Sequence, residues 1–350
     1  MAFVLHERLL LLLVLFPSLA APSRVPAVIV FGDSTVDAGN NNFIPTIARA
    51  NFPPYGQDFP GGRATGRFCN GRLATDFISE ALGLPSIVPA YLDPAYGITD
   101  FATGVCFASA ATGLDAATSD VLSAIPLWQE MELFKEYQQK LEGYVGKTKA
   151  NYIVNEAVYI VSVGTNDFIE NYYSGVTERR EQFTVEEYED FLIRHAADFV
   201  TELHRLGARK VSFTGLTPFG CLPSERTSNL MNPGECMEEY NTVARDFNAK
   251  LQALTSRLSA ALPGLKLRLA PLYDLLLHVV QNPASYGFEV ASRGCCGTGE
   301  IETSYLCNQW NPFTCEDADR YAFWDAIHPS ERLNRLCANQ TLRTGLAEFV

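Results

Sequence analysis

The 350-residue chain lacks several patterns that mark common functional classes. Its cysteines and histidines never occur at C-x-x-C or H-x-x-x-H spacing, so no zinc site is indicated. It has no G-x-S-x-G pentapeptide, which argues against the nucleophile turn of α/β-hydrolases. In GGRATGRF, Arg67 and Phe68 stand where a phosphate-binding loop needs lysine and a hydroxyl. The sequence therefore predicts no metal and no cofactor.

Positive charge is also scarce. Lys and Arg number 27 against 40 Asp and Glu, which gives a net charge of −13 and a pI near 4.9. An acidic surface repels phosphate backbones and anionic membranes, so we expect no nucleic-acid partner. Arg63, Arg67 and Arg72 do gather in GGRATGRFCNGR. We expect a solvated loop or a structural ion pair there.

The longest apolar block lies near the N-terminus. Residues 9–16 are apolar, Arg8 precedes them, and Ser18 and Ala20 suit a cleavage site. The block is shorter than the roughly 20 residues that a membrane-spanning helix needs, and no later segment is long and apolar enough to span. We expect a cleaved signal peptide over residues 1–21 and a secreted protein. A signal anchor, or residence in the ER or Golgi, is the alternative.

Nine cysteines suit an oxidising compartment. Two of them, Cys69 and Cys106, lie early, and we expect Cys106 to be a small buried apolar residue. The other seven form a late group that we expect to staple long loops: Cys221, Cys236, Cys295, Cys296, Cys307, Cys315 and Cys337. The spacing does not fix the pairing, and an odd count leaves at least one thiol outside an intrachain disulfide. Asn339, in NQT, is the single N-glycosylation acceptor, provided that it is exposed.

Short apolar runs alternate with long helical patterns along the chain. The runs cover residues 27–31, 104–108, 158–163, 210–214 and 265–269. One of the helical patterns begins after Thr184 and stops at Gly207. Strands separated by helices of this length pair in parallel through right-handed crossovers. We therefore expect one three-layer α/β/α domain over residues 22–350, with a parallel sheet of about five strands.

The first of these runs stops abruptly in VIVFGDSTVDAGNNN, residues 28–42. Such sheets bind ligands at the carboxyl ends of their strands, where Ser34 would present its hydroxyl. Ser34 is either a turn residue or a nucleophile, and a nucleophile needs a base. His195, His204 and His278 lie in helical patterns, whereas His328 follows Asp325 by three residues and precedes a proline. We expect Asp325 to orient His328, and His328 to accept the proton of Ser34.

An acyl-transfer site also needs donors for an oxyanion. Asn166 stands just beyond the third strand in VYIVSVGTNDF, where its amide either caps a turn or meets the oxyanion. The segment GVCFASAATGLD ends another strand in small residues, and a bare backbone N–H there can reach a substrate oxygen.

Together these segments resemble the plant GDSL esterase/lipases of the SGNH hydrolase superfamily. Four segments occur in the family's order and spacing: FGDSTVDAGNNN, FASAATGLD, VGTND and FWDAIHPSE. Three further segments also resemble that family, namely GRATGRFCNGR, LTPFGCLPSE and GCCGTGE. The resemblance implies a flavodoxin-like SGNH fold, with Ser34 as the nucleophile of a triad that Asp325 and His328 complete. It implies an oxyanion hole formed by the Ser34 N–H, an N–H of the second motif, here at Ala111, and the Asn166 amide.

One residue departs from that pattern. Ala111 stands where the family usually carries glycine. Alanine keeps the N–H donor, but it would be strained if the position needs a positive φ.

The resulting expectation is a serine carboxylic-ester hydrolase of the secretory pathway. An acyl-enzyme on Ser34 would hydrolyse lipid or other acyl esters. Deacetylation of cell-wall polysaccharide and acyl transfer on the same scaffold are the alternatives. A catalytically silent binding protein is the alternative of another class. The expected partner is therefore a small-molecule, lipid or acylated-polysaccharide ester.

Overall fold

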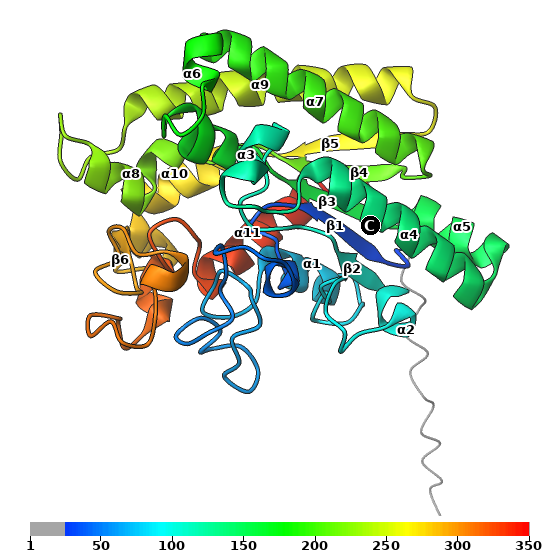
Figure 1. Cartoon of the computed structure of the whole chain (residues 1–350), viewed down its shortest axis with the longest axis horizontal. Helices are drawn as coiled ribbons and strands as arrows, with labels where there is room; N and C mark the ends of the chain where they lie inside the picture. Colours follow the sequence, from blue (N-terminus) through cyan, green and yellow to red (C-terminus); the bar gives the residue numbers. More distant parts are fainter. Residues whose placement is uncertain (1–24, 350) are drawn as a thin grey trace, which may run out of the picture.

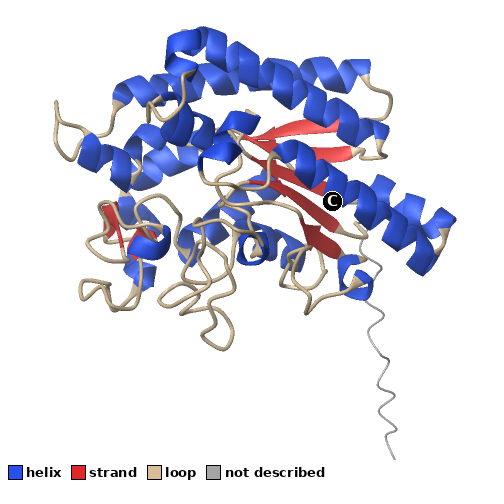
Figure 2. Cartoon of the chain, viewed as in Figure 1, coloured by secondary structure: helices blue, strands red, loops and turns tan. Residues whose placement is uncertain are grey.

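The computed structural model describes residues 25–349, so the predicted signal peptide lies outside the described residues. A five-stranded parallel sheet lies at its centre (Figures 1 and 2). Its strands, in chain order, are β1 Val28–Gly32, β2 Gly104–Cys106, β3 Val158–Ser162, β4 Lys210–Thr214 and β5 Lys266–Ala270. The spatial order β2-β1-β3-β4-β5 is that of flavodoxin-like sheets. All five predicted strands are confirmed to within two residues.

Helices connect these strands and continue beyond them. The α-helices are α1 Ala74–Ala81, α2 Ile98–Phe101, α3 Ala116–Val121, α4 Leu127–Val145, α5 Lys147–Glu156, α6 Arg179–Gln182, α7 Val185–Arg205, α8 Pro223–Ser228, α9 Glu238–Ala261, α10 Tyr273–Gln281 and α11 Glu331–Arg343. The shorter helical segments are η1 Asn40–Phe43, the π-helical η2 Asp167–Tyr172, η3 Phe219–Cys221, η4 Pro283–Tyr286, η5 Ser304–Leu306 and η6 Ala318–Arg320.

Alternate side chains of the sheet enter two separate apolar layers. Ile29 and Phe31 of β1 pack with residues of α4, α5, α7 and α9, whereas Val28 and Val30 pack with residues of α1 and α11. Figure 1 shows the two helical layers on opposite sides of the strands. Every side chain of β1 is buried, as a central parallel strand requires. The expected three-layer α/β/α arrangement is confirmed.

Helix α7 shows how local signals set the element bounds. Thr184 accepts a hydrogen bond from the Glu187 N–H, and the Glu187 carboxylate accepts from the Thr184 N–H, forming a capping box. After the helix, Gly207 has φ +110°, and a Cβ there would lie 2.9 Å from side-chain atoms of Val154 and Asn155. The start and the stop predicted for this helix are therefore confirmed.

A second, two-stranded parallel sheet pairs β6 Val290–Gly294 with β7 Tyr321–Phe323. No sequence pattern predicted this second sheet. The 26 residues between these strands form mostly loops, which appear in orange in Figure 1.

Six of the late cysteines form disulfides, as expected, and the structure supplies the pairing that the sequence left open: Cys221–Cys236, Cys295–Cys315 and Cys296–Cys307. Cys337, expected to join that group, is free and buried on the inner face of α11. It lies in an amphipathic helix rather than in a loop, so it packs as an apolar residue. Cys69 and Cys106 are also free and buried, and burial raises the pKa of both thiols.

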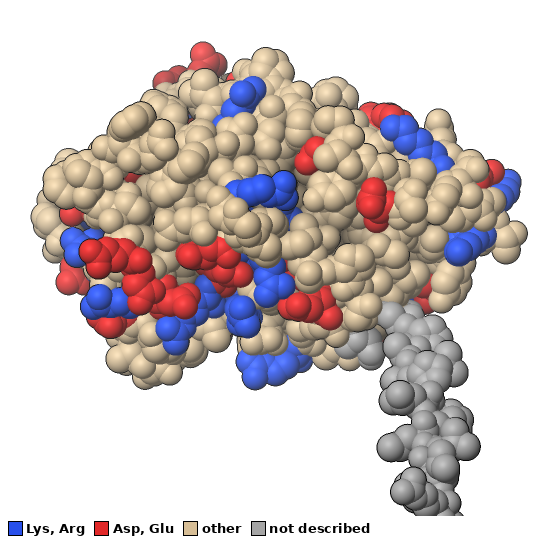
Figure 3. Space-filling view, turned by 90° about the horizontal axis from the view of Figure 1, so that it is seen from below, with Lys and Arg blue, Asp and Glu red and all other residues tan. Residues whose placement is uncertain are grey.

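Charged residues have structural or surface roles. The guanidinium of Arg67 is buried and contacts both carboxylate oxygens of Asp76 at 2.8 and 2.9 Å, so it forms the expected ion pair. On the face drawn in Figure 3, blue Lys and Arg side chains lie among red Asp and Glu side chains. Across residues 25–349, no helix has the length and apolar character needed to cross a membrane.

Candidate active site

A tight turn ends β1 and presents Ser34. Gly32 has φ +135°, and a Cβ there would lie 1.9 Å from the carbonyl oxygen of Ser162 on β3, so only glycine fits. The Asp33 N–H donates to that same oxygen at 2.9 Å. Asp33 Oδ1 then accepts from the N–H and Oγ1 of Thr35 at 3.0 and 2.6 Å. This turn places Ser34 at the carboxyl edge of the sheet.

Three residues that are remote in sequence meet at this edge. Ser34 Oγ lies 2.8 Å from Nε2 of His328, and Nδ1 of the same ring lies 2.8 Å from both carboxylate oxygens of Asp325. Because Nδ1 faces a carboxylate, it carries the ring proton and leaves Nε2 to accept from the serine. The three side chains are 7%, 4% and 0% exposed, in the order Ser34, His328, Asp325. This is the arrangement that general-base activation of a serine requires.

The carboxylate of Asp325 receives donors on both oxygens. Oδ1 accepts the backbone N–H groups of Ile327 and His328 at 2.9 and 2.7 Å, and Oδ2 accepts the Tyr55 hydroxyl at 2.7 Å. Burial alone would raise the pKa of Asp325, but the charge and hydrogen bonds of His328, together with Tyr55, outweigh it. The pKa of Asp325 therefore lies below its ordinary value, and the group stays ionised.

Tyr55 is a neighbour of the site that sequence reasoning missed. Its ring packs edge-on against Phe52, Phe68 and Trp324, and the Phe68 ring also lies 4.9 Å from the His328 ring. The sequence carries only a weak signal for it, namely several aromatic residues within a loop rich in Gly and Pro. Such residues indicate a loop that is buried, but not what it contacts.

The expected oxyanion donors are available. Among residues 25–349, the backbone N–H groups of Ser34 and Ala111 donate no hydrogen bond. Asn166 Nδ2 donates to the carbonyl oxygen of Thr112 at 3.0 Å, which uses one of its two amide hydrogens. Asn166 and Ser34 border the same cavity, whereas Ala111 is not among its lining residues.

Ala111 has the conformation for which the family pattern favours glycine. Its φ is +73°, in the left-handed region that alanine rarely adopts. The preceding residue is fixed on both sides, because the Ala110 N–H donates to Asp37 Oδ2 at 3.2 Å and the Ala110 carbonyl accepts from Asn41 Nδ2 at 3.0 Å. These contacts hold Ala111 in a strained conformation.

The Asn-rich segment after Ser34 anchors the turn that carries Ser34 to β2. Asp37 Oδ1 accepts the N–H groups of Gly39 and Asn40, each at 2.7 Å. Asn40 Nδ2 in turn donates to the carbonyl oxygens of Cys106 and Ala108 at 2.9 and 2.8 Å. Residues expected to shape a turn therefore also link two neighbouring strand ends.

Asp167, the residue after Asn166, is hydrogen-bonded to the segment that follows Ala111. Its carboxyl group accepts the N–H groups of Leu114 and Asp115 at 2.8 and 2.9 Å and the Thr118 hydroxyl at 2.7 Å. Burial raises the pKa of Asp167 to about 7, although these hydrogen bonds act in the opposite direction. The contacts tie the π-helical η2 to the loop that carries Ala111.

Other carboxyl groups lie buried or half-buried in the same part of the fold. Glu130 Oε2 accepts the Gly32 N–H at 2.9 Å, and burial raises the pKa of Glu130 well above its ordinary value. Burial also raises the pKa of Asp33 and of Asp37 to about 6, and that of Glu170 to about 7. Protonation of these groups therefore favours the folded state.

A small cavity of about 60 Å³ opens beside Ser34. Its polar side includes Ser34, Thr35, Ser162 and Asn166. Its apolar side is formed by Leu216, Leu222, Leu276, Phe323 and Ile327. A short apolar group fits this space beside the serine hydroxyl.

Comparison with known proteins assigns the chain to a family. The family model of the GDSL-like Lipase/Acylhydrolase matches residues 28–341, which include every predicted site residue. This chain belongs to the GDSL lipase/acylhydrolase family. The resemblance seen in the sequence is thereby confirmed, and the chain is an ester hydrolase.

Similar proteins from Arabidopsis thaliana cover nearly the whole chain. The chain is 57% identical to GDSL esterase/lipase At2g42990, with 91% of each protein covered. It is 56% identical to GDSL esterase/lipase At4g26790, with 97% of this chain and 95% of that protein covered. It is 44% identical to GDSL esterase/lipase APG, with 92% of each covered.

Proposed function

We propose that the chain is a secreted serine carboxylic-ester hydrolase in which Ser34 is the nucleophile, His328 the base and Asp325 the residue that orients the base. The observation that carries the proposal is the continuous line of contacts from Ser34 Oγ through His328 to Asp325, each 2.8 Å long. Hydrogen-bonded side chains in this order, beside unused N–H donors, suit acyl transfer through a covalent intermediate.

In the acylation half, Ser34 Oγ attacks the ester carbonyl carbon while Nε2 of His328 takes the hydroxyl proton. The N–H groups of Ser34 and Ala111 and the amide of Asn166 stabilise the oxyanion. Collapse of the tetrahedral intermediate breaks the carbon–oxygen bond to the alcohol, and the alcohol leaves with the proton from His328. Ionised Asp325 stabilises the imidazolium formed between these two proton transfers.

In the deacylation half, His328 removes a proton from water, and the resulting hydroxide attacks the acyl-enzyme carbonyl. The oxyanion forms again and is stabilised by the same donors. Breakage of the bond to Ser34 Oγ releases the carboxylic acid, and the proton on His328 returns to the serine. The cycle consumes one water and restores the starting state.

The cavity beside Ser34 favours a short acyl chain. A volume of about 60 Å³ accommodates an acyl group of a few carbons, and the apolar lining suits it. The same observation supports a second candidate, the removal of a small acyl group such as acetyl from a larger alcohol, including a polysaccharide. In both cases the alcohol part of the ester lies outside this cavity.

An ester panel tests the proposal. We expect wild-type protein to hydrolyse p-nitrophenyl acetate and butyrate faster than the octanoate and palmitate. Ser34→Ala should lose turnover on every ester while its thermal melting temperature stays the same. Turnover retained by Ser34→Ala would remove the serine from the mechanism, and a preference for palmitate would reverse the chain-length proposal.

The secretory route completes the proposal. Removal of residues 1–21 would start the mature chain at Pro22, and the three disulfides support passage through an oxidising compartment. Asn339 is exposed on α11, as glycosylation requires, although Thr341 of the same acceptor sequence is buried. N-terminal peptide mapping of protein secreted by plant cells, with and without peptide N-glycosidase, tests both points.

A further inference from the structure

Asp325 lies on a segment whose backbone is hydrogen-bonded on both sides to a disulfide-closed loop. On one side of Asp325, the Trp324 carbonyl accepts the Cys296 N–H at 2.7 Å. On the other side, the Ala326 N–H donates to the Glu302 carbonyl at 2.9 Å. The backbone of Asp325 is therefore held between two points of the loop that runs from Cys295 to Cys315.

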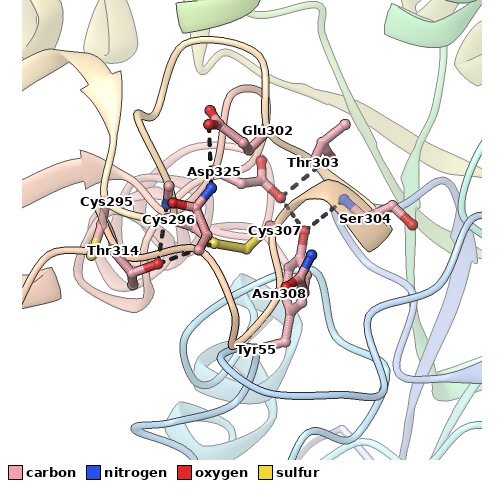
Figure 4. The surroundings of a disulfide bond; sticks show 12 residues. Tyr55, Cys295, Cys296, Glu302, Thr303, Ser304, Cys307, Asn308, Thr314 and Asp325 are labelled. Atoms are coloured by element: carbon pink, nitrogen blue, oxygen red, sulfur yellow. Dashed lines mark hydrogen bonds between the residues drawn. A yellow bond between two sulfur atoms is a disulfide. The ribbon is translucent and has the colours of Figure 1, made fainter.

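The Asp325 side chain is connected to the same loop through Tyr55. The Tyr55 hydroxyl donates to Asp325 Oδ2 at 2.7 Å and accepts the Ser304 N–H at 2.8 Å, as Figure 4 shows. Thr303 Oγ1 makes a longer contact of 3.4 Å with the same carboxylate oxygen. Tyr55 therefore bonds to Asp325 on one side and to the loop on the other.

Ser304, which fixes the Tyr55 hydroxyl, is itself firmly placed. Its φ is +49°, and its Oγ accepts the Arg49 N–H at 3.0 Å and donates to the Arg49 carbonyl at 2.8 Å. Close by, the Cys296–Cys307 disulfide closes the 11-residue span that contains Ser304 (Figure 4). The position of the N–H that orients Tyr55 is thus set by tertiary contacts and by a covalent bond.

We propose that Tyr55 is a positioning residue of the catalytic site, which holds Asp325 Oδ2 in place so that the carboxylate keeps the His328 ring directed at Ser34. The proposal rests on the proposed function. Burial, and then the charge of Asp325, raise the pKa of Tyr55 well above its ordinary value, so the hydroxyl remains a donor across the working pH range. Its ring contacts place the hydroxyl against Asp325, and Tyr55 is not among the residues that line the cavity beside Ser34.

Tyr55→Phe removes the hydroxyl and keeps the ring that packs against Trp324. We expect kcat for p-nitrophenyl acetate to fall about 10-fold, the size of effect that loss of one hydrogen bond to a buried charge produces. KM should stay within about twofold, because Tyr55 does not line the cavity beside Ser34. The low-field proton resonance of the Nδ1–H between His328 and Asp325 should shift, a readout that loss of stability alone would not move.

The matched control is Tyr159→Phe. Tyr159, near the amino end of β3, is also fully buried, and its hydroxyl donates one hydrogen bond at 2.8 Å, to the Val154 carbonyl on α5. This variant should lose a similar amount of stability and keep its kcat and its low-field resonance. An equal loss of kcat in both variants, or a wild-type kcat and resonance in Tyr55→Phe, would overturn the inference.

Failure of the inference differs from failure of the proposed function. If Tyr55→Phe is fully active while Ser34→Ala is inactive, only the positioning role of Tyr55 is contradicted. An active Ser34→Ala would contradict the proposed function itself. Should Tyr55→Phe fail to fold, two disulfide variants give the same answer. Cys296→Ser with Cys307→Ser should lower kcat in folded protein, and Cys221→Ser with Cys236→Ser should not; equal kcat in the two would contradict the inference.

Discussion

The two sides of the candidate site are built differently. Ser34 follows a central strand, and its turn is formed by sheet hydrogen bonds and by Gly32, whose missing side chain lets β1 approach β3. Asp325 and His328 lie outside the central sheet, just after β7, where a disulfide-closed loop and Tyr55 hold them. One side is fixed by close backbone packing, the other by covalent loops and side-chain contacts.

The electrostatics of the two sides also differ. Burial raises the pKa of Asp33, Asp37 and Asp167 near the nucleophile to about 6 or 7, whereas the pKa of Asp325 lies below its ordinary value. The buried carboxyls near Ser34 therefore serve mainly as hydrogen-bond acceptors. On the other side, Asp325 must keep its negative charge beside His328. Substitution of Asp325 should therefore lower kcat, whereas substitution of the buried carboxyls near Ser34 should act more on stability and its pH dependence.

The largest effect should come from Asp325→Asn. The amide lacks the charge that stabilises the imidazolium and favours the wrong His328 tautomer, so kcat should fall by up to about 10⁴-fold. Steady-state kinetics on p-nitrophenyl acetate measure this. Asp76→Asn is the control, because it removes an equally buried carboxylate that pairs with Arg67. It should lower the melting temperature and leave kcat unchanged; a fully active Asp325→Asn would remove that residue from the mechanism.

Asn166→Ala tests the nucleophile side. Loss of one oxyanion donor typically costs about 10²–10³-fold in kcat, and KM should change little because the contact strengthens in the transition state. Asn171→Ala is the control, since Asn171 lies in the π-helical segment that Asn166 immediately precedes, and its amide donates to Thr118 and Tyr188. If Asn166→Ala raised KM at constant kcat, Asn166 would be a binding residue instead.

The buried carboxyls predict how stability depends on pH. Asp33, Asp37 and Asp167 have folded pKa values above the ordinary value near 4, so they favour folding most when protonated. That contribution is complete below pH 4 and is lost as the pH rises through about 6 to 7. The free energy of unfolding should be larger at pH 5 than at pH 8 by several kcal/mol, since one pKa unit corresponds to about 1.4 kcal/mol.

Urea unfolding at these two pH values measures the difference. Asp167→Asn carries a neutral side chain at both, so the difference should shrink in that variant. Groups with lowered pKa, such as Asp325 and Glu302, titrate below this range and do not interfere. Stability that rises from pH 5 to pH 8 would contradict the prediction.

The smallest expected effect is that of Ala111→Gly. Alanine at φ +73° is strained, and glycine adopts this conformation freely while keeping the N–H. We expect the free energy of unfolding to rise by about 1 kcal/mol with activity retained. Ala110→Gly is the control at a neighbouring position without a positive φ, and it should lower stability. A loss of stability in Ala111→Gly would mean that the methyl group packs favourably.

The nucleophile side could be predicted from sequence because its signals are local. An apolar run that ends in Gly-Asp-Ser indicates both the strand and the turn, and Asn166 follows the third strand in the same way. The Asp325–His328 pair was found through its three-residue spacing. In each case the residues that matter lie within a few positions of a recognisable pattern.

The support of Asp325 could not be predicted, because it comes from contacts over long sequence distances. Tyr55 meets Asp325 across 270 residues, and no periodicity or turn signal encodes such a contact. The pairing of Cys295, Cys296, Cys307 and Cys315 was equally open, since neighbouring cysteines allow several arrangements. The β6–β7 sheet depends on that loop, so it was missed for the same reason.

A fluorophosphonate labelling experiment tests the central claim most directly. The probe reacts only with a serine that a neighbouring base activates, so peptide mapping by mass spectrometry identifies the nucleophile. The account predicts a single labelled peptide carrying the adduct on Ser34, slower labelling in Asp325→Asn and none in Ser34→Ala. An adduct on Ser109 or Ser162, or labelling that persists in Ser34→Ala, would contradict it.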